Sequence, residues 1–169
     1  MIPELNPRQR AWVEVSPAAI RANARALCQH LGARTQLMAV VKADGYGHGA
    51  ETVARAALQG GATSLGVATL QEGLELRRAG LEAPVLLLSN LNEPDDLRTC
   101  LHWRLMPTLS SLRDAQLCNA LAADSGRCFD VQLKIDTGMA RLGCSLSEGH
   151  QTACLLYTSP SPRDERRSR

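Results

Sequence analysis

Two lysines are the residues of this sequence with the clearest chemical potential. The chain carries 19 Lys and Arg residues, of which only Lys42 and Lys134 are lysines. Arginine stays protonated in proteins, whereas a lysine amine can lose its proton and attack a carbonyl group. Lys42 follows a short apolar run at 38–41, so it is predicted at the carboxyl end of a strand, where parallel α/β proteins bind ligands. Biased codon usage could also explain why the chain has only two lysines, without any chemical role for them.

The segment 43–49, which follows Lys42, is rich in glycine. Three glycines alternate in it, and Tyr46 and His48 stand between them. Glycines allow sharp turns and close approach of a ligand to the backbone, although alone they indicate only a tight loop. His48 is expected to be a turn or helix-cap residue rather than a catalyst.

The second lysine has an arginine nearby. Arg141 lies seven residues beyond Lys134, across a predicted turn at Thr137 and Gly138. From the residue types alone, Lys134 and Arg141 would be a pair of surface cations with Asp136 as their solvated partner.

Both segments carry a resemblance to a known family. The stretch AVVKADGYGHG, residues 39–49, resembles the pyridoxal-phosphate attachment signature of the alanine racemase family. The stretch KIDTGMARLG, residues 134–143, resembles a second motif of that family, in the right order and about ninety residues later. The similarity runs from about Arg10 to Cys144. It implies the N-terminal, pyridoxal-phosphate-binding barrel portion of an alanine racemase.

The resemblance also implies a role for each site residue. Lys42 would bind pyridoxal phosphate covalently and act as the base specific for the D-enantiomer. Tyr46 would donate its hydroxyl to the cofactor phosphate. Arg141 would face both the cofactor's phenolic oxygen and the substrate carboxylate, and Lys134 would be a possible carbamate. No metal is expected.

The rest of the chain predicts alternating strands and helices. Strands are expected at 37–42, 64–68, 84–89, 105–109 and 129–135, and helices at about 49–59, 70–79, 93–102 and 111–124. This alternation indicates a parallel sheet with helices outside it. The repeat of about 20–27 residues suits a (β/α)₈ TIM-type barrel, of which about five βα units are present. A doubly wound sheet competes, but no G-x-G-x-x-G motif follows a strand.

The N-terminal part adds one strand and one helix to this prediction. Residues 11–15 alternate in polarity like a strand, and Ser16 followed by Pro17 predicts the start of a helix that ends near Gly32. In the family that the chain resembles, the first strand pairs with a C-terminal β domain. Because that domain is missing here, the 11–15 strand is expected to lack a partner. Thr69 to Glu72 is a capping box for the helix at 70–79, and Asn92 is a candidate cap for the helix at 93–102.

Composition excludes several classes of protein. The net charge of +2 is accounted for by the last fifteen residues, which leaves a neutral body with no basic stripe for nucleic acid. No apolar run approaches the roughly twenty residues of a membrane span. The six cysteines form no C-x-x-C pair, and free thiols in the cytoplasm are favoured over disulfides.

The C-terminal residues differ in composition from the rest. Residues 155–169 are rich in Ser, Pro and Arg, so they are expected to be disordered. They could be a phosphorylatable basic arm, but translated adapter sequence fused to the native protein is favoured. Residues 1–154 would then form the barrel portion.

The sequence thus predicts a fragment of an alanine racemase that interconverts L- and D-alanine and supplies D-alanine for peptidoglycan. The whole enzyme would be a cytoplasmic homodimer whose active site is shared between subunits. Alternatives are a non-catalytic pyridoxal-phosphate carrier on the same barrel, and another enzyme of this fold such as a serine racemase or an amino-acid decarboxylase. A carrier would complete eight strands, which this chain cannot.

Overall fold

The computed structural model describes residues 12–91 and 93–158 and contains a single parallel sheet of five strands in the order β1-β2-β3-β4-β5. Neighbours in the sheet are also neighbours in the chain, as in the successive units of a barrel. This order excludes the doubly wound alternative, in which the strand order reverses. The strands are β1 (Met38–Val40), β2 (Ser64–Val67), β3 (Val85–Asn90), β4 (Leu105–Leu109) and β5 (Gln132–Leu133).

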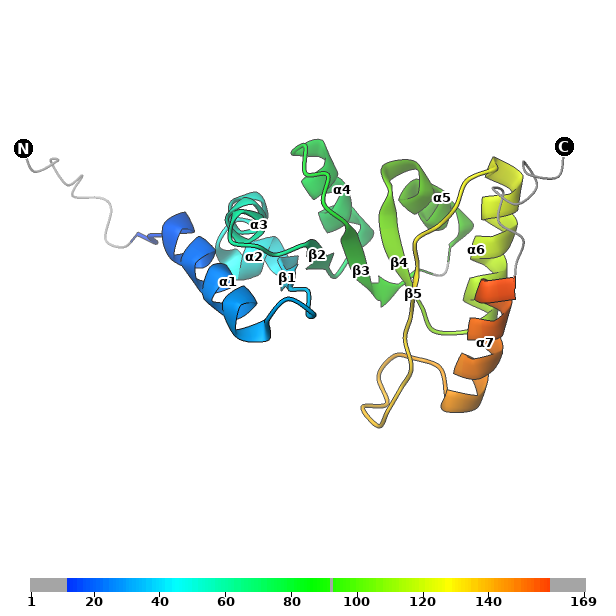
Figure 1. Cartoon of the computed structure of the whole chain (residues 1–169). Helices are drawn as coiled ribbons and strands as arrows, with labels where there is room; N and C mark the ends of the chain where they lie inside the picture. Colours follow the sequence, from blue (N-terminus) through cyan, green and yellow to red (C-terminus); the bar gives the residue numbers. More distant parts are fainter. Residues whose placement is uncertain (1–11, 92, 159–169) are drawn as a thin grey trace, which may run out of the picture.

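Helices connect each strand to the next (Figure 1). The first helix, α1, packs along α3, and the last, α7, packs against α6. In Figure 1, α1 lies at one side of the molecule and α7 at the other. The helices are α1 (Pro17–Leu31), α2 (Lys42–Gly47), α3 (Ala50–Gln59), α4 (Leu70–Arg78), α5 (Pro94–Trp103), α6 (Leu112–Ser125) and α7 (Leu146–Thr158).

The helix caps follow the sequence signals. Ser16 accepts a hydrogen bond from the Ala19 N–H, and Pro17 occupies the first turn of α1, as predicted. A capping box joins Thr69 and Glu72 at the start of α4. At α5 the residue before the helix is Glu93, which makes no side-chain cap. The predicted cap, Asn92, lies outside the described residues.

The two faces of the sheet are buried to different extents. Side chains that point toward the helices are buried. Three of them align across neighbouring strands and are at most 2% exposed: Leu65, Val85 and Leu105. The next residues along the strands point to the opposite face, where Val40 is 39% exposed. In a closed barrel this second face would be the filled interior. The structure is therefore an open, partial barrel whose helix-covered side alone is a complete core.

Three predictions about the ends of the chain and of the strands need correction. Residues 12–15 pair with no strand in the described part of the chain, so they form no strand themselves, and Val13 is 82% exposed. The predicted strands at 37–42 and 129–135 shorten to β1 and β5, because the chain leaves the sheet at Lys42 and pairs with β4 only at Gln132 and Leu133.

The C-terminal helix α7 was not predicted from the sequence. It extends through residues 155–158, so the expected disorder does not begin at Leu155. Leu155 and Leu156 pack against the apolar cluster that α6 forms with β4, which explains why the helix continues. Residues 159–169 lie outside the described residues.

Candidate active site

Lys42 lies two residues beyond the end of β1, at the carboxyl edge of the sheet, and is the first residue of α2. The preceding residue, Val41, is fully buried, and its N–H donates to the carbonyl of Gly66 in β2 at 2.8 Å. The side chain of Lys42 is half-buried. The lysine is thus anchored through the sheet on one side, while its amine remains reachable from outside.

The short element α2 is a left-handed turn rather than an ordinary helix or the expected loop. Residues 43–46 all have positive φ, between 51° and 61°, and positive ψ. This conformation costs about 1–2 kcal/mol for each residue other than glycine. Gly45 is buried in the turn, and a Cβ there would stand 2.9 Å from Cγ2 of Val53. Close packing against α3 therefore requires glycine at this position.

Side chains hold both ends of this turn. At its first residue, the N–H of Ala43 donates to Glu72 at 2.8 Å. The Asp44 side chain, also in the turn, accepts from the N–H of Ala50 at 2.8 Å, which links the turn to the first residue of α3. His48 follows the turn, and its Nδ1 lies 3.0 Å from the carbonyls of Gly45 and Tyr46. His48 is therefore a cap, as predicted.

Glu72 receives an unusual number of backbone hydrogen bonds. One carboxylate oxygen accepts from Ala43, and the other accepts from Ala68 at 2.7 Å and from Thr69 at 3.1 Å. Burial alone would raise the pKa of Glu72, but these three bonds and the nearby charge of Lys42 outweigh it and lower that pKa. The carboxylate is thus held ionised beside the lysine. The sequence predicts Glu72 only as part of a capping box and does not predict its contact with Ala43.

Tyr46 lies beside Lys42. The Lys42 Nζ is 5.9 Å from the centre of the Tyr46 ring, which is within the range of a cation–π contact. The Tyr46 side chain is 59% exposed. An amine and a phenol therefore stand together at the end of β1.

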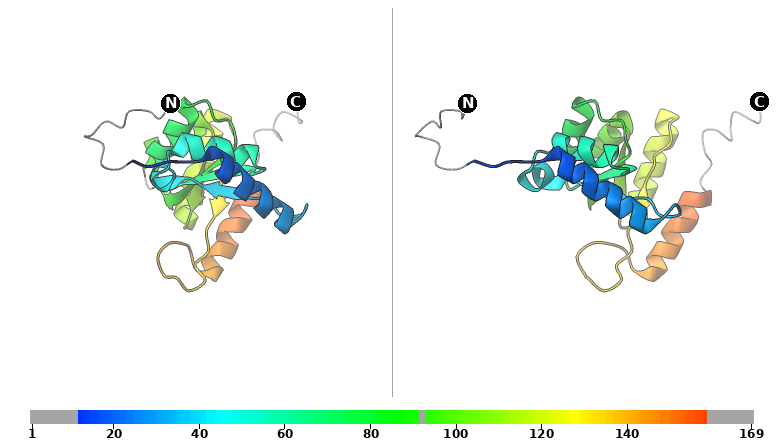
Figure 2. Two further views of the ribbon diagram at one scale, coloured as in Figure 1. Left: turned by 90° about the vertical axis from the view of Figure 1, so that its left-hand side faces the viewer. Right: turned by 60° about the vertical axis from the view of Figure 1, so that its left-hand side comes forward.

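Lys134 and Arg141 lie on one loop, residues 134–144, that follows β5. The loop closes where Asp136 N–H donates to the carbonyl of Cys144 and Cys144 N–H donates to that of Lys134. Figures 1 and 2 show the loop projecting from the sheet. Gly143 is required at the crossing, because a Cβ there would be 2.6 Å from the Asp136 nitrogen.

Asp136 organises this loop instead of pairing with the two cations. Its carboxylate accepts from the N–H groups of Gly138 and Ala140, both at 3.0 Å. These bonds lower the pKa of Asp136, although desolvation acts in the opposite direction. Arg141 is exposed and Lys134 is half-buried. Within the described residues no hydrogen bond or ion pair joins Lys134, Arg141 and Lys42.

The sheet nevertheless brings these residues to one edge. Lys42 follows β1 and Lys134 follows β5, and all five strands are parallel, so both lysines stand at the carboxyl edge. Polar groups that were not predicted lie between the two lysines: Ser110 donates to Asn90 at 2.8 Å, and Ser89 donates to the Ala68 carbonyl. Their position at the ends of the predicted strands is the sequence feature from which they could have been predicted.

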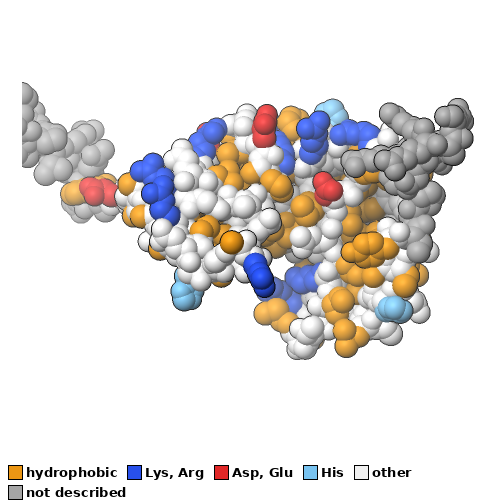
Figure 3. All heavy atoms as spheres, viewed as in Figure 1, with side chains coloured by type: hydrophobic (Ala, Val, Ile, Leu, Met, Phe, Trp, Pro, Cys, Tyr) orange, Lys and Arg blue, Asp and Glu red, His pale blue; other side chains and the backbone are white. Residues whose placement is uncertain are grey.

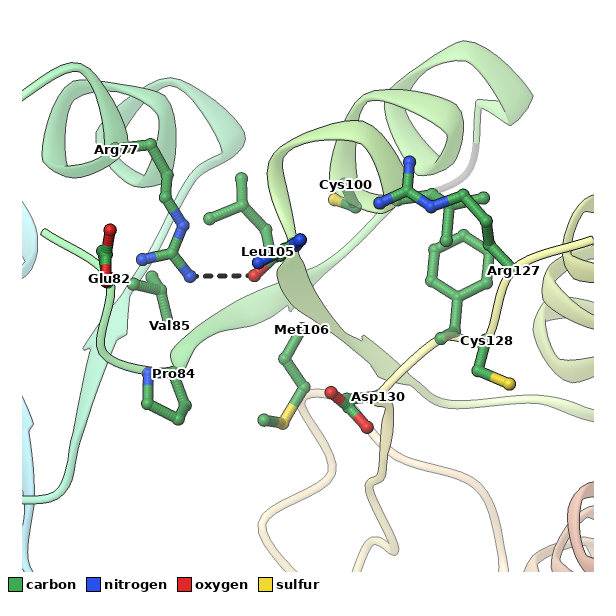
Figure 4. Close-up of a pocket in the computed structure, with 13 residues that line it drawn as sticks. Arg77, Glu82, Pro84, Val85, Cys100, Leu105, Met106, Arg127, Cys128 and Asp130 are labelled. Atoms are coloured by element: carbon green, nitrogen blue, oxygen red, sulfur yellow. Dashed lines mark hydrogen bonds between the residues drawn. The ribbon is translucent and has the colours of Figure 1, made fainter. Parts of the chain in front are cut away.

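A cavity of about 310 Å³ lies at the opposite, amino-terminal edge of the sheet (Figure 4). It is lined by residues that precede β3, β4 and β5, including Glu82, Arg104 and Arg127. Figure 4 shows Arg77 directed toward the start of β4, where it donates to the carbonyl of Arg104. Arg77 also donates to the carbonyls of Leu81 and Ala83. It therefore holds loops together, and none of the predicted site residues lines this cavity.

The residues at the carboxyl edge fit pyridoxal phosphate in their chemistry. The half-buried amine of Lys42 is accessible to an aldehyde. The phenol of Tyr46 and the exposed guanidinium of Arg141 are donors suited to a phosphate and a carboxylate. No group of three or more potential metal ligands occurs among the described residues. No helix in the described part of the chain is long and apolar enough to cross a membrane.

Two of the cysteines, Cys100 on α5 and Cys118 on α6, are buried in the core. Cys28, Cys100, Cys118 and Cys144 are free thiols. Burial raises the pKa of both Cys100 and Cys118 to about 12, and nearby carboxylates act in the same direction. These two thiols are therefore unreactive core residues.

Comparisons with known proteins give a consistent result. A family model described as "Alanine racemase, N-terminal domain" matches residues 15–161. An alanine racemase of Prochlorococcus marinus is 64% identical over 143 residues, which are 85% of this chain and 37% of that protein. One from Synechocystis sp. is 50% identical over 156 residues, 92% of this chain and 42% of that protein.

Solved structures have the same fold. A crystal structure of alanine racemase from E. faecalis superposes with a TM-score of 0.78 at 36% identity, covering 86% of this chain and 39% of that one. A histidine racemase from Leuconostoc mesenteroides gives a TM-score of 0.80 at 26% identity, covering 92% and 42%. The chain thus spans about two fifths of the length of the relatives it matches.

Proposed function

Because the chain belongs to the family of alanine racemase N-terminal domains, we propose that it is the cofactor-binding part of a pyridoxal-phosphate-dependent alanine racemase. The observation that carries this proposal is the placement of Lys42. Its amine stands at the carboxyl edge of a partial barrel, beside a phenol, at the start of a turn fixed at both ends.

Each site residue has a role in this proposal. Lys42 binds pyridoxal phosphate covalently, Tyr46 donates to its phosphate, and Arg141 binds both the cofactor and the carboxylate of alanine. The chemistry that pyridoxal phosphate supplies when bound is withdrawal of electrons from the α-carbon of the amino acid. The Lys42 amine then removes or returns a proton on one face of that carbon. The opposite face requires a second base, which we assign to a part of the enzyme beyond this chain.

The assignment of Lys42 is tested by reduction with borohydride. The whole racemase is incubated with pyridoxal phosphate, reduced and digested, and the labelled peptide is identified by mass spectrometry. We expect the label on Lys42 and its loss in Lys42→Ala. Lys134→Arg is the matched control, because Lys134 is the only other lysine in this sequence. A label on Lys134, or none at all, would refute the assignment.

We further propose that Lys134 is carbamylated when bicarbonate is present. Two cations on one closed loop repel each other, and a carbamate would turn Lys134 into an acceptor for Arg141. Carbon NMR of the enzyme in ¹³C-labelled bicarbonate should show a carbamate signal that Lys134→Arg abolishes. A spectrum without that signal in the wild-type enzyme would contradict the proposal.

The remaining parts of the proposal concern the whole enzyme. It would act in the cytoplasm as a homodimer with a shared active site and supply D-alanine for peptidoglycan. A racemase for another amino acid is the second candidate, and the likeness to the histidine racemase supports it. Comparing the turnover of L-alanine and L-histidine by the whole enzyme separates the two candidates.

A further inference from the structure

Glu72 links the ends of two neighbouring strands at the candidate site. Ala68 and Thr69 follow β2, and Ala43 follows Lys42 at the end of β1. One carboxylate receives hydrogen bonds from all three of these backbone N–H groups, at 2.7–3.1 Å. We propose that Glu72 is a positioning residue for Lys42, because it fixes the backbone from which the lysine side chain extends.

The left-handed turn explains why such a residue is needed. Ala43 has φ 51° and ψ 51°, a conformation that residues with a Cβ avoid. The hydrogen bond from its N–H to Glu72 is therefore the contact that holds the first residue of the turn in place. If this contact were lost, the backbone beside Lys42 could relax toward the right-handed region and move the amine.

Only a carboxylate can make this set of contacts. Ala43 donates to Oε1, whereas Ala68 and Thr69 donate to Oε2, so both oxygens must act as acceptors. Glutamine has one acceptor oxygen, and its NH₂ group would face an N–H at the other position. Glu72→Gln therefore removes the charge and breaks one side of the link, although it preserves the size of the side chain.

Glu75 provides a matched control on the same helix. It is exposed on α4 and accepts a hydrogen bond from Gln71 within that helix. Glu75→Gln changes the charge of α4 by the same amount without touching the turn. Thr69→Ala is a second control, because it removes the hydroxyl that caps α4 but leaves the contacts of the Glu72 carboxylate.

The experiment measures the protection of the Ala43 amide against hydrogen exchange in the 169-residue chain, without cofactor. Glu72→Gln should lower this protection about ten- to hundredfold, as the loss of a hydrogen bond to a charged group predicts. Glu75→Gln should leave it within about threefold of the wild type, the range expected of a surface change that does not touch the contact. Thr69→Ala removes a helix cap worth about 1 kcal/mol and should lower it less than Glu72→Gln does. Equal protection in Glu72→Gln and Glu75→Gln would overturn the proposal, as would an equal loss in Thr69→Ala.

A second readout follows the lysine itself. Because the chain has only two lysines, acetylation of Lys42 can be measured relative to Lys134 in one sample by mass spectrometry. We expect the ratio to change in Glu72→Gln and to stay constant in Glu75→Gln. An unchanged ratio in both variants would count against a positioning role even if the turn loosened. Should Glu72→Gln fail to fold, Glu72→Asp, which keeps the charge but shortens the reach to Ala43, is measured in the same way.

The positioning of Lys42 by Glu72 matters for catalysis only if the proposed function holds. The two readouts themselves do not depend on that function, because both are made without pyridoxal phosphate. If borohydride does not label Lys42 but Glu72→Gln loosens the turn, the proposed function fails and the positioning role stands. If Lys42 is labelled equally in wild type and Glu72→Gln, and the turn is unchanged, the positioning role fails alone.

Discussion

Lys42 is held through the backbone on both sides of it. Val41 is fixed by the bond to Gly66 in β2, and Ala43 by the bond to Glu72 in α4. Such an arrangement leaves the side chain free while its origin stays fixed, which is what a group that binds a ligand and transfers protons requires. The 134–144 loop uses the same device, because the Asp136 carboxylate holds the backbone that carries Arg141.

At the residue scale, the charge of Glu72 predicts a pH dependence of stability. Its pKa is lowered from the ordinary value of 4.5, so the folded state binds its proton more weakly than the unfolded state does. The stabilisation is fully present above about pH 4.5 and is lost as the pH falls through the lowered value. Glu72→Gln, which does not titrate, is the reference.

Urea unfolding of the two proteins at a series of pH values makes the comparison. The free energy of unfolding of the wild type should exceed that of Glu72→Gln by a constant amount near neutral pH. The difference should shrink below about pH 4.5. A difference that grows on acidification would mean that the carboxylate is not stabilised in the folded state.

At the scale of elements, the helices do more than connect strands. The helix-facing side of the sheet is sealed, and a second apolar cluster, built by α5, β4 and α6, extends it. Leu155 and Leu156 bring α7 onto that cluster. Away from these clusters, Met139 in the 134–144 loop and Leu146 in α7 are 74% and 72% exposed. Figure 3 shows apolar side chains gathered in the region of α7 and the 134–144 loop.

Leu97 tests the importance of this second cluster. It lies on α5, is 1% exposed and packs with Leu109 of β4 and Ala115 of α6. Leu97→Ala should lower the free energy of unfolding by about 2–5 kcal/mol, because it leaves a cavity. Leu27→Ala, at a site on α1 that is 52% exposed, is the control and should cost less than about 1 kcal/mol. Equal losses in both variants would show that α5 does not belong to the core.

At the scale of the whole molecule, the sheet is an open one. Five parallel strands leave β1 and β5 as edges and leave the second face of the sheet incompletely covered. The chain has two tyrosines. Tyr46 stands at the end of β1, whereas Tyr157 is on α7, at the other end of the molecule (Figure 1), and is 91% exposed. No second tyrosine therefore faces Lys42 in the described part of the chain.

We accordingly expect the 169-residue chain to have no racemase activity by itself. Racemisation needs a proton donor or acceptor on each face of the α-carbon, and losing one such group costs about 10²–10⁴ in rate. The assay follows D-alanine formation from L-alanine with excess pyridoxal phosphate. Turnover well above that of free cofactor, abolished by Lys42→Ala, would show that the chain supplies both groups.

The sequence by itself determined the alternation of strands and helices, the caps of α1 and α4, and the two motifs that carry the family resemblance. These are local signals: apolar runs, a Ser-Pro pair and short stretches of fixed residues. Through the resemblance, they assigned Lys42 and Tyr46 to the same cofactor. That Lys42 and Lys134 stand at one edge emerged only from the pairing of the five parallel strands.

The tertiary structure decided what depends on contacts between distant residues. The left-handed turn exists because Glu72, 29 residues away from Ala43 in sequence, accepts its N–H, and because Val53 packs where a side chain at Gly45 would be. The helix α7 extends past Cys154 because Leu155 and Leu156 pack against an apolar cluster of α5, β4 and α6. Residues 12–15 form no strand, although their pattern suits one, because a strand needs a partner and the described residues provide none.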